Sequence, residues 1–206
     1  MVNTYLLQAH TPHGQIEYSC MTKLVSTESL IPYMNKKHYD MLCEKGCPNY
    51  GKKWSCPPFA PKYDRFVQSY QYIQVVMLLV KMEQFDYIAR DNLKIKAANS
   101  ILKSRVDKAL RQTMSEDEFY ISTGSCKLCK PCKKKIDEKC AHPKRRSFSY
   151  EAMGIHVSAM TEALFGKELL WYKKHHLPEY TCVVAGLLTN DKEPREKVAE
   201  QLKRLN

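Results

Sequence analysis

Seven of the nine cysteines fall into two groups along the chain. The first group consists of Cys43, Cys47 and Cys56. The second group consists of Cys126, Cys129, Cys132 and Cys140. Thiols at such short spacings are typical of metal ligands, and a chain of 206 residues in a reducing compartment does not depend on a disulfide framework. The grouping therefore predicts metal binding by both sets of cysteines.

The second group begins with C-x2-C-x2-C spacing. Three cysteines at this spacing can hold three corners of one iron–sulfur cubane, whereas a zinc knuckle usually combines one C-x2-C pair with a distant second pair. The spacing favours a 4Fe–4S cluster, with zinc as the alternative. Cys140 can supply the fourth corner, but ferredoxin runs place proline directly after that cysteine, and here Pro143 comes later. The sequence leaves open whether Cys140 serves this group or the first.

The first group has C-x3-C-x8-C spacing and contains no fourth cysteine. If it binds a cubane, the fourth iron is left for Cys20, His38, a remote cysteine or an exogenous ligand. An iron without a protein thiolate can act as a Lewis acid or bind sulfur. The aromatic side chains of Tyr50, Trp54 and Phe59 are expected to shield such a cluster from water.

Six lysines lie among the second group of cysteines, within residues 124–140. Cations next to thiols favour the thiolate and balance a cluster's negative charge, although lysines 133–135 could equally form a solvated helix start. Cys20 and Cys182 lie in apolar strand patterns and are expected to be core thiols. His142 is an additional candidate ligand.

The chain carries a formal net charge of +11. This charge is compatible with nucleic acid, an acidic protein partner or compensation of buried anions. Because no nucleic-acid recognition motif is present and the lysines concentrate at cysteines, we expect a redox partner or an acidic protein, not nucleic acid. The longest apolar run is far shorter than the roughly 20 residues that cross a bilayer, and no signal-like segment begins the chain. We therefore expect a cytoplasmic protein with no membrane segment.

Hydrophobic patterning predicts one domain over residues 1–206, with an α/β or α+β fold built on a single sheet flanked by helices. Strands are expected at 14–25, 71–80, 118–122 and 180–189. Helices are expected near 26–34, 61–70 and 91–114, from 150 to a break at Gly154, and again over 156–165, with a solvated C-terminal helix at 191–206. The two cysteine-rich segments, 36–61 and 122–147, are predicted to be metal-binding loops without regular structure.

Two stretches of the sequence resemble a known family. They are "CEKGCPNYG…WSCPP" and "GSCKLCKPC…CAHP…SYEAMGI". The pattern over roughly residues 43–188 is similar to the family catalogued as predicted metal-binding protein, domain of unknown function 2284. The resemblance implies a prokaryotic cytosolic protein with cysteine-ligated metal, most simply iron–sulfur. His156 stands where an acidic residue is expected. Glu151 is a candidate for supporting the metal or for acid–base chemistry, and alternatively a helix-start carboxylate.

These observations favour an iron–sulfur protein with one or two clusters, active in electron transfer or in redox or sulfur chemistry at an open iron. Such a protein would be a redox or sulfur-transfer enzyme if it also binds a small-molecule substrate. The alternative is a zinc-stabilised binding module with a basic surface for nucleic acid or an acidic partner. No hydrolase, kinase or dinucleotide-binding signature is present.

Overall fold

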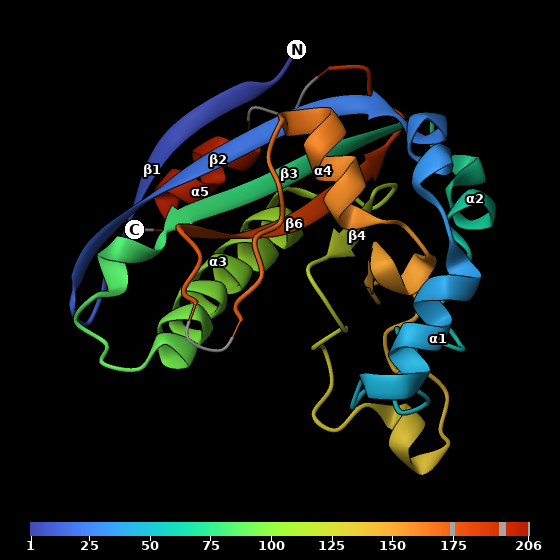
Figure 1. Cartoon of the computed structure of the whole chain (residues 1–206). Helices are drawn as coiled ribbons and strands as arrows, with labels where there is room; N and C mark the ends of the chain where they lie inside the picture. The colour runs from blue at the N-terminus through green and yellow to red at the C-terminus, as the bar shows by residue number, and fades with distance from the viewer. Residues whose placement is uncertain (174–175, 194–196, 206) are drawn as a thin grey trace.

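The computed structural model describes residues 1–173, 176–193 and 197–205. Within them, six strands form one sheet in the order β1-β2-β3-β6-β4-β5 (Figure 1). The strands are β1 (Asn3–Thr11), β2 (Gly14–Ser26), β3 (Tyr72–Lys81), β4 (Phe119–Ser122), β5 (Phe148–Ser149) and β6 (Tyr180–Thr189). All neighbouring strands are antiparallel except β4 and β5, which are parallel. The expected single sheet with flanking helices is confirmed, as a mixed α+β fold.

Helices cover both faces of this sheet. The α-helices are α1 (Lys36–Gly46), α2 (Tyr63–Phe66), α3 (Asp91–Thr113), α4 (Val157–Phe165) and α5 (Lys197–Arg204). The 3-10 segments are η1 (Thr27–Tyr33), η2 (Val67–Ser69), η3 (Met82–Phe85), η4 (Lys133–Ile136) and η5 (Glu151–Met153). Helices α3 and α5 pack on one face, whereas η1, α2, η5 and α4 pack on the other (Figure 1). Among the described residues, no helix combines the length and apolar character needed to cross a bilayer.

Strand β3 lies at the centre of the fold and is buried on both faces. Val76 and Leu78 belong to the core beneath α3, whereas Val75 and Met77 belong to the core on the opposite face. Successive side chains of a strand point to opposite faces, so a continuous apolar run is what two covered faces require. The prediction of a buried central strand is confirmed.

The long helix α3 also follows its predicted pattern. The side chains of Ala98, Leu102 and Val106 are fully buried against the sheet. The C-terminal helix α5 begins later than expected, and the predicted segment includes residues 194–196 and 206, which lie outside the described part. The description of this helix as solvated was wrong, because Val198 and Leu202 are fully buried in the same core.

The segment 36–46 was expected to lack regular structure and instead forms helix α1. Its first turn is capped by Asn35, whose side-chain oxygen accepts a hydrogen bond from the backbone N–H of His38 at 3.2 Å. Lys36 is the only residue of α1 that is buried, so the helix lacks the apolar stripe that usually predicts a helix from sequence. The prediction failed because the inner side of α1 faces a cysteine-rich loop instead of an apolar core.

Two glycines allow elements to approach more closely than any other residue would. Gly154 ends η5 with φ 98°, and a Cβ at this position would lie 2.7 Å from the Cα of Lys36 at the start of α1. Gly186 lies within β6, where a Cβ would lie 2.3 Å from the hydroxyl oxygen of Tyr150. That hydroxyl is buried and donates a hydrogen bond to the carbonyl of Ala185 at 3.2 Å. These contacts fix the segment 150–155 between the sheet and α1.

The Gly186→Ala substitution should destabilise the protein by about 1–3 kcal/mol, because the new methyl group overlaps the Tyr150 hydroxyl inside a packed core. Chemical denaturation of the purified protein measures the effect. Gly46→Ala is the matched control, since a Cβ there meets no atom within 4 Å, and it should leave the free energy of unfolding unchanged or slightly raised. Adding Tyr150→Phe to Gly186→Ala should recover part of the loss. Equal stability of the two alanine variants would contradict the assigned contact.

Candidate metal centre

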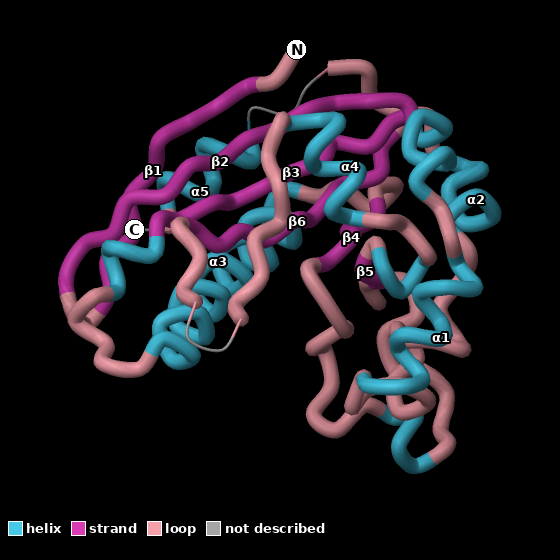
Figure 2. Tube along the Cα trace, viewed as in Figure 1, coloured by secondary structure: helices cyan, strands magenta, loops and turns pink. Residues whose placement is uncertain are grey.

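The two cysteine-rich segments lie together at the end of the molecule away from β1 (Figures 1 and 2). Residues 53 and 55 of the first segment form hydrogen bonds with the second segment. Lys53 Nζ donates to the hydroxyl of Ser125 at 3.0 Å and to the carbonyl of Cys126 at 3.3 Å. The Ser55 hydroxyl accepts a hydrogen bond from the backbone N–H of Cys126 at 3.0 Å. Both the N–H and the carbonyl of Cys126, the first cysteine of the second group, are therefore bonded to the first loop.

Trp54, between these two residues, holds the opposite part of the second loop. Its indole N–H donates to the carbonyl of Glu138 at 2.8 Å. Its ring lies edge-on to Phe59, with centroids 5.0 Å apart. The ammonium group of Lys134 lies 5.2 Å from the Trp54 ring and 4.9 Å from the Phe59 ring. Two of the three aromatic side chains expected to shield the first group, Trp54 and Phe59, thus contact the second loop.

The four cysteines of the second group line one small cavity. They share it with Trp54, Ser55, Leu128, His142 and Arg146. Burial raises the pKa of the Cys129 thiol, and the neighbouring thiols of Cys132, Cys140 and Cys126 raise it further, in that order. Cys140 therefore lies beside the other three cysteines of the second group.

Arg146 brings a positive charge to this cavity. Its guanidinium carbon lies 4.9 Å from the centre of the Phe148 ring. Its Nε atom is buried and has no hydrogen-bond partner among the described residues. A buried N–H without an acceptor is costly, so this donor is suited to an anionic group held by the four thiols.

The first group is assembled from helix α1 and the turn that follows it. Cys43 lies in the last turn of α1, and Cys47 caps the helix with its N–H bonded to the Cys43 carbonyl at 2.9 Å. The C-x3-C spacing thus places both residues one helical turn apart on the same side. Burial, together with the charges of Cys47 and Cys56, raises the pKa of Cys43 to about 11. The three cysteines therefore lie within electrostatic reach of one another.

Cys56 connects the first group to the second. It is 6% exposed, and burial raises its pKa. A hydrogen bond with the Ser55 hydroxyl, whose oxygen lies 3.8 Å from the sulfur, lowers this pKa, and the charges of Cys47 and Cys132 raise it again. Ser55 thus contacts a thiol of the first group and the backbone of the second.

The remaining sequence candidates lie elsewhere. Cys20 is fully buried beneath α3, as expected of a core thiol, and His38 lies more than a helical turn before Cys43. Cys182 is only partly buried, with a pKa that burial raises to about 12. His142 lines the second group's cavity. In the described part of the chain, no three His, Cys, Asp or Glu side chains converge closely enough to hold a single metal ion.

Glu151 has a position that the sequence did not reveal. Its backbone begins η5, where the Ser149 hydroxyl accepts the N–H of Ala152 at 3.2 Å, as expected for a helix start. Its carboxyl group lines a separate cavity beside α3. Burial raises the pKa of Glu151, and the Glu151 charge in turn contributes to the raised pKa of Cys43.

Sequence reasoning missed Lys53, Ser55 and Arg146. Lys53 and Ser55 flank Trp54 in the motif "KWSCPP", so their closeness to a cysteine was visible. Their partners lie more than 70 residues away and could not be identified without the fold. Arg146 follows Arg145 in a run of basic residues, and nothing in the sequence indicates that only one of the two arginines lines the cavity.

A comparison with protein families places the chain among known sequences. The family described as predicted metal-binding protein, domain of unknown function 2284, matches residues 29–188, and the chain belongs to this family. The expected resemblance is thereby confirmed. No curated protein and no solved structure matches the chain significantly.

The Ser55→Ala substitution should destabilise the protein by about 0.5–1.5 kcal/mol, because it leaves the partly buried N–H of Cys126 without its acceptor. Chemical denaturation under reducing conditions measures the change. Ser104→Ala, on the exposed side of α3, is the matched control and should have no effect. If both variants unfold at the same denaturant concentration as the parent protein, Ser55 does not join the loops.

Proposed function

We propose that the two cysteine groups bind iron–sulfur clusters, with a 4Fe–4S cluster in the second group, and that the protein acts in electron transfer or redox chemistry. The observation that carries this proposal is the cavity lined by Cys126, Cys129, Cys132 and Cys140. Four thiols arranged around a cavity suit a cubane, because each thiolate binds a different iron. The C-x2-C-x2-C spacing supports iron over zinc for the same reason.

The surroundings of this cavity support an anionic group. A four-iron cluster with four thiolates carries about two negative charges overall. Arg146 offers a buried N–H without a partner, and Lys133 lowers the pKa of Cys129. Lys53 lowers the pKa of Cys56 in the first group. Cations close to thiols favour the thiolate, which is the form that binds metal.

The first group supports a second cluster with a different ligand set. It contributes three thiols, Cys43, Cys47 and Cys56, and no cysteine of the described chain stands with them as a dedicated fourth ligand. A cluster held in this way would have one iron available to an exogenous ligand. When bound, iron–sulfur clusters supply electrons one at a time, and an open iron can also bind sulfur or a substrate. Redox or sulfur-transfer catalysis is therefore the enzyme class we propose.

Exposed lysines around the second group suggest the kind of redox partner. Lys127, Lys130, Lys135 and Lys139 are exposed and lie beside the half-buried cysteines. A ring of like charge around a redox centre attracts an oppositely charged protein and orients it for electron transfer. We therefore propose an acidic protein as the electron donor or acceptor.

Iron and acid-labile sulfide in protein purified without air test the proposal. The parent protein should be brown and contain both elements. Cys126→Ser should lose the iron and sulfide of one cluster, which is about half of the total if both sites are filled. Cys43→Ser should lose the iron and sulfide bound by the first group. Cys182→Ser, outside both groups, is the matched control and should retain the parent content. Stoichiometric zinc without sulfide, even after reconstitution with iron and sulfide, would instead establish the zinc-stabilised binding module.

A further inference from the structure

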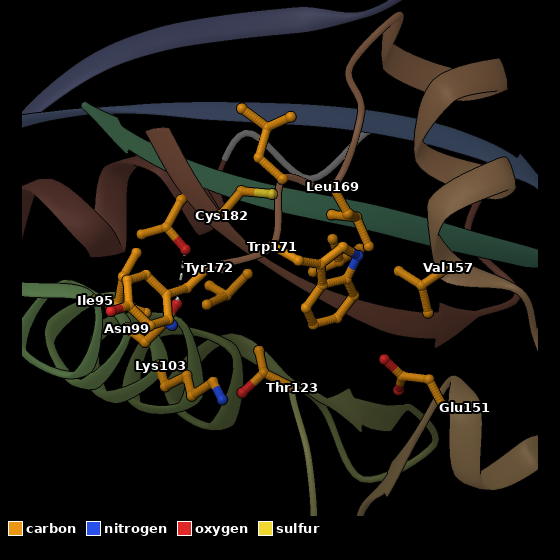
Figure 3. A pocket seen from close by; sticks show the side chains of 14 residues that line it. Ile95, Asn99, Lys103, Thr123, Glu151, Val157, Leu169, Trp171, Tyr172 and Cys182 are labelled. Carbon is orange, nitrogen blue, oxygen red and sulfur yellow. Dashed lines mark hydrogen bonds between the residues drawn. The ribbon is translucent and has the colours of Figure 1, made fainter. Parts of the chain in front are cut away.

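A second cavity lies between helix α3 and strand β6, apart from both cysteine groups. Its volume is about 420 Å³. Its floor is the strand segment 181–184, and its walls include Lys103 from α3, Glu151 from η5 and the loop segment 169–172 (Figure 3). The volume and the mixture of apolar and polar walls are typical of small-molecule sites.

The cavity exists because strand β4 is short. Its residues pair only with Gly186, Leu187 and Leu188 of β6. Among the described strands, none pairs with residues 180–185 along that edge. An unpaired strand edge presents backbone N–H and C=O groups, which a bound molecule can use as hydrogen-bond partners.

Lys103 provides a positive charge on one side of the cavity. It is half-buried, and within the described chain it makes no hydrogen bond or ion pair. Figure 3 shows its side chain extending from α3 at the edge of the cavity, which Thr123 also lines. Burial lowers the pKa of Lys103, the charge of Lys127 lowers it further, and Glu151 acts in the opposite direction. A half-buried cation without an ion-pair partner favours an anionic ligand.

The rest of the cavity is suited to an apolar body. Figure 3 shows the indole of Trp171 at the cavity, with Val157 and Leu169 among the apolar side chains that line it. Trp171 is 68% exposed, although it is one of the largest apolar side chains in the protein. An aromatic ring left open over a cavity gains buried area when a ligand packs against it.

We propose that this cavity binds a small organic carboxylate, whose carboxylate pairs with Lys103 and whose apolar body packs against Trp171 and the open edge of β6. This inference goes beyond the proposed function, because no cysteine of either group lines the cavity. Glu151 stands opposite Lys103 and would repel a second anionic group. The site therefore favours monocarboxylates over dicarboxylates.

Equilibrium dialysis with benzoate, and with its neutral isostere benzamide, tests the proposal on the full-length protein. Benzoate should bind saturably, and benzamide should bind about tenfold more weakly, because it cannot form the ion pair. Lys103→Met should weaken benzoate binding by a similar factor and leave benzamide binding unchanged. Lys108→Met, an exposed lysine on the same helix, is the matched control and should bind benzoate as the parent does.

A second variant keeps the test independent of any folding defect at Lys103. Trp171→Ala removes an exposed side chain and should weaken the binding of both probes, because both lose the same apolar contact. Equal affinity for benzoate and benzamide, or unchanged benzoate binding by Lys103→Met, would overturn the proposal. So would the absence of saturable benzoate binding at millimolar concentrations. Dialysis measures bound benzoate and not iron. The result therefore supports or overturns the carboxylate site even if the protein binds no iron–sulfur cluster.

Discussion

The hydrogen bonds made by three consecutive residues, Lys53, Trp54 and Ser55, are the constraint on which the candidate metal centre depends. Together they hold the second cysteine loop at Cys126 and at Glu138, near its two ends. That loop contains only one turn of 3-10 helix and few buried apolar side chains, so it has little other means of acquiring a fixed shape. Each hydrogen bond contributes about 0.5–1.5 kcal/mol. Their combined effect is to bring two cysteine groups, separated by about seventy residues of sheet and helix, into one region.

The sheet in turn positions the first group through the segment 150–156. The backbone N–H of Asn35 donates to the carbonyl of Gly154 at 2.7 Å, and the N–H of His156 donates to the carbonyl of Tyr33 at 2.8 Å. These bonds fix the entry to α1, and the helix then carries Cys43 and Cys47 to the loop. His156 also caps α4, since its Nδ1 accepts the N–H of Ala159 at 2.9 Å. His156, where the resemblance led us to expect an acidic residue, therefore has a structural role here.

The elements that the sequence predicted are those whose side chains enter an apolar core. Strand β3 and helix α3 are examples, because burial imposes a period of 2 or 3.6 that can be read directly. Helix α1 was not predicted, because its sequence has no apolar stripe. The helix packs against the segment η5 and polar loops instead of an extended apolar core. The two groups of cysteines could also be predicted, since the members of each group are close in the chain. The contact between the two groups could not be predicted, because it depends on single polar side chains whose partners are set by the tertiary fold.

Glu151 relates the two functional regions of the molecule. Its carboxyl group lines the cavity beside α3, while its charge also acts on Cys43 of the first group. Burial raises its pKa and hydrogen bonds from its own backbone and Ser149 lower it, so its charge depends on how well the surrounding space excludes water. The segment that carries Glu151 also connects the two regions through the backbone. Glu151 begins η5 and lines the cavity, whereas Gly154 ends η5 and packs against Lys36 at the start of α1. Residues 151–154 therefore lie between the cavity and the helix that carries Cys43.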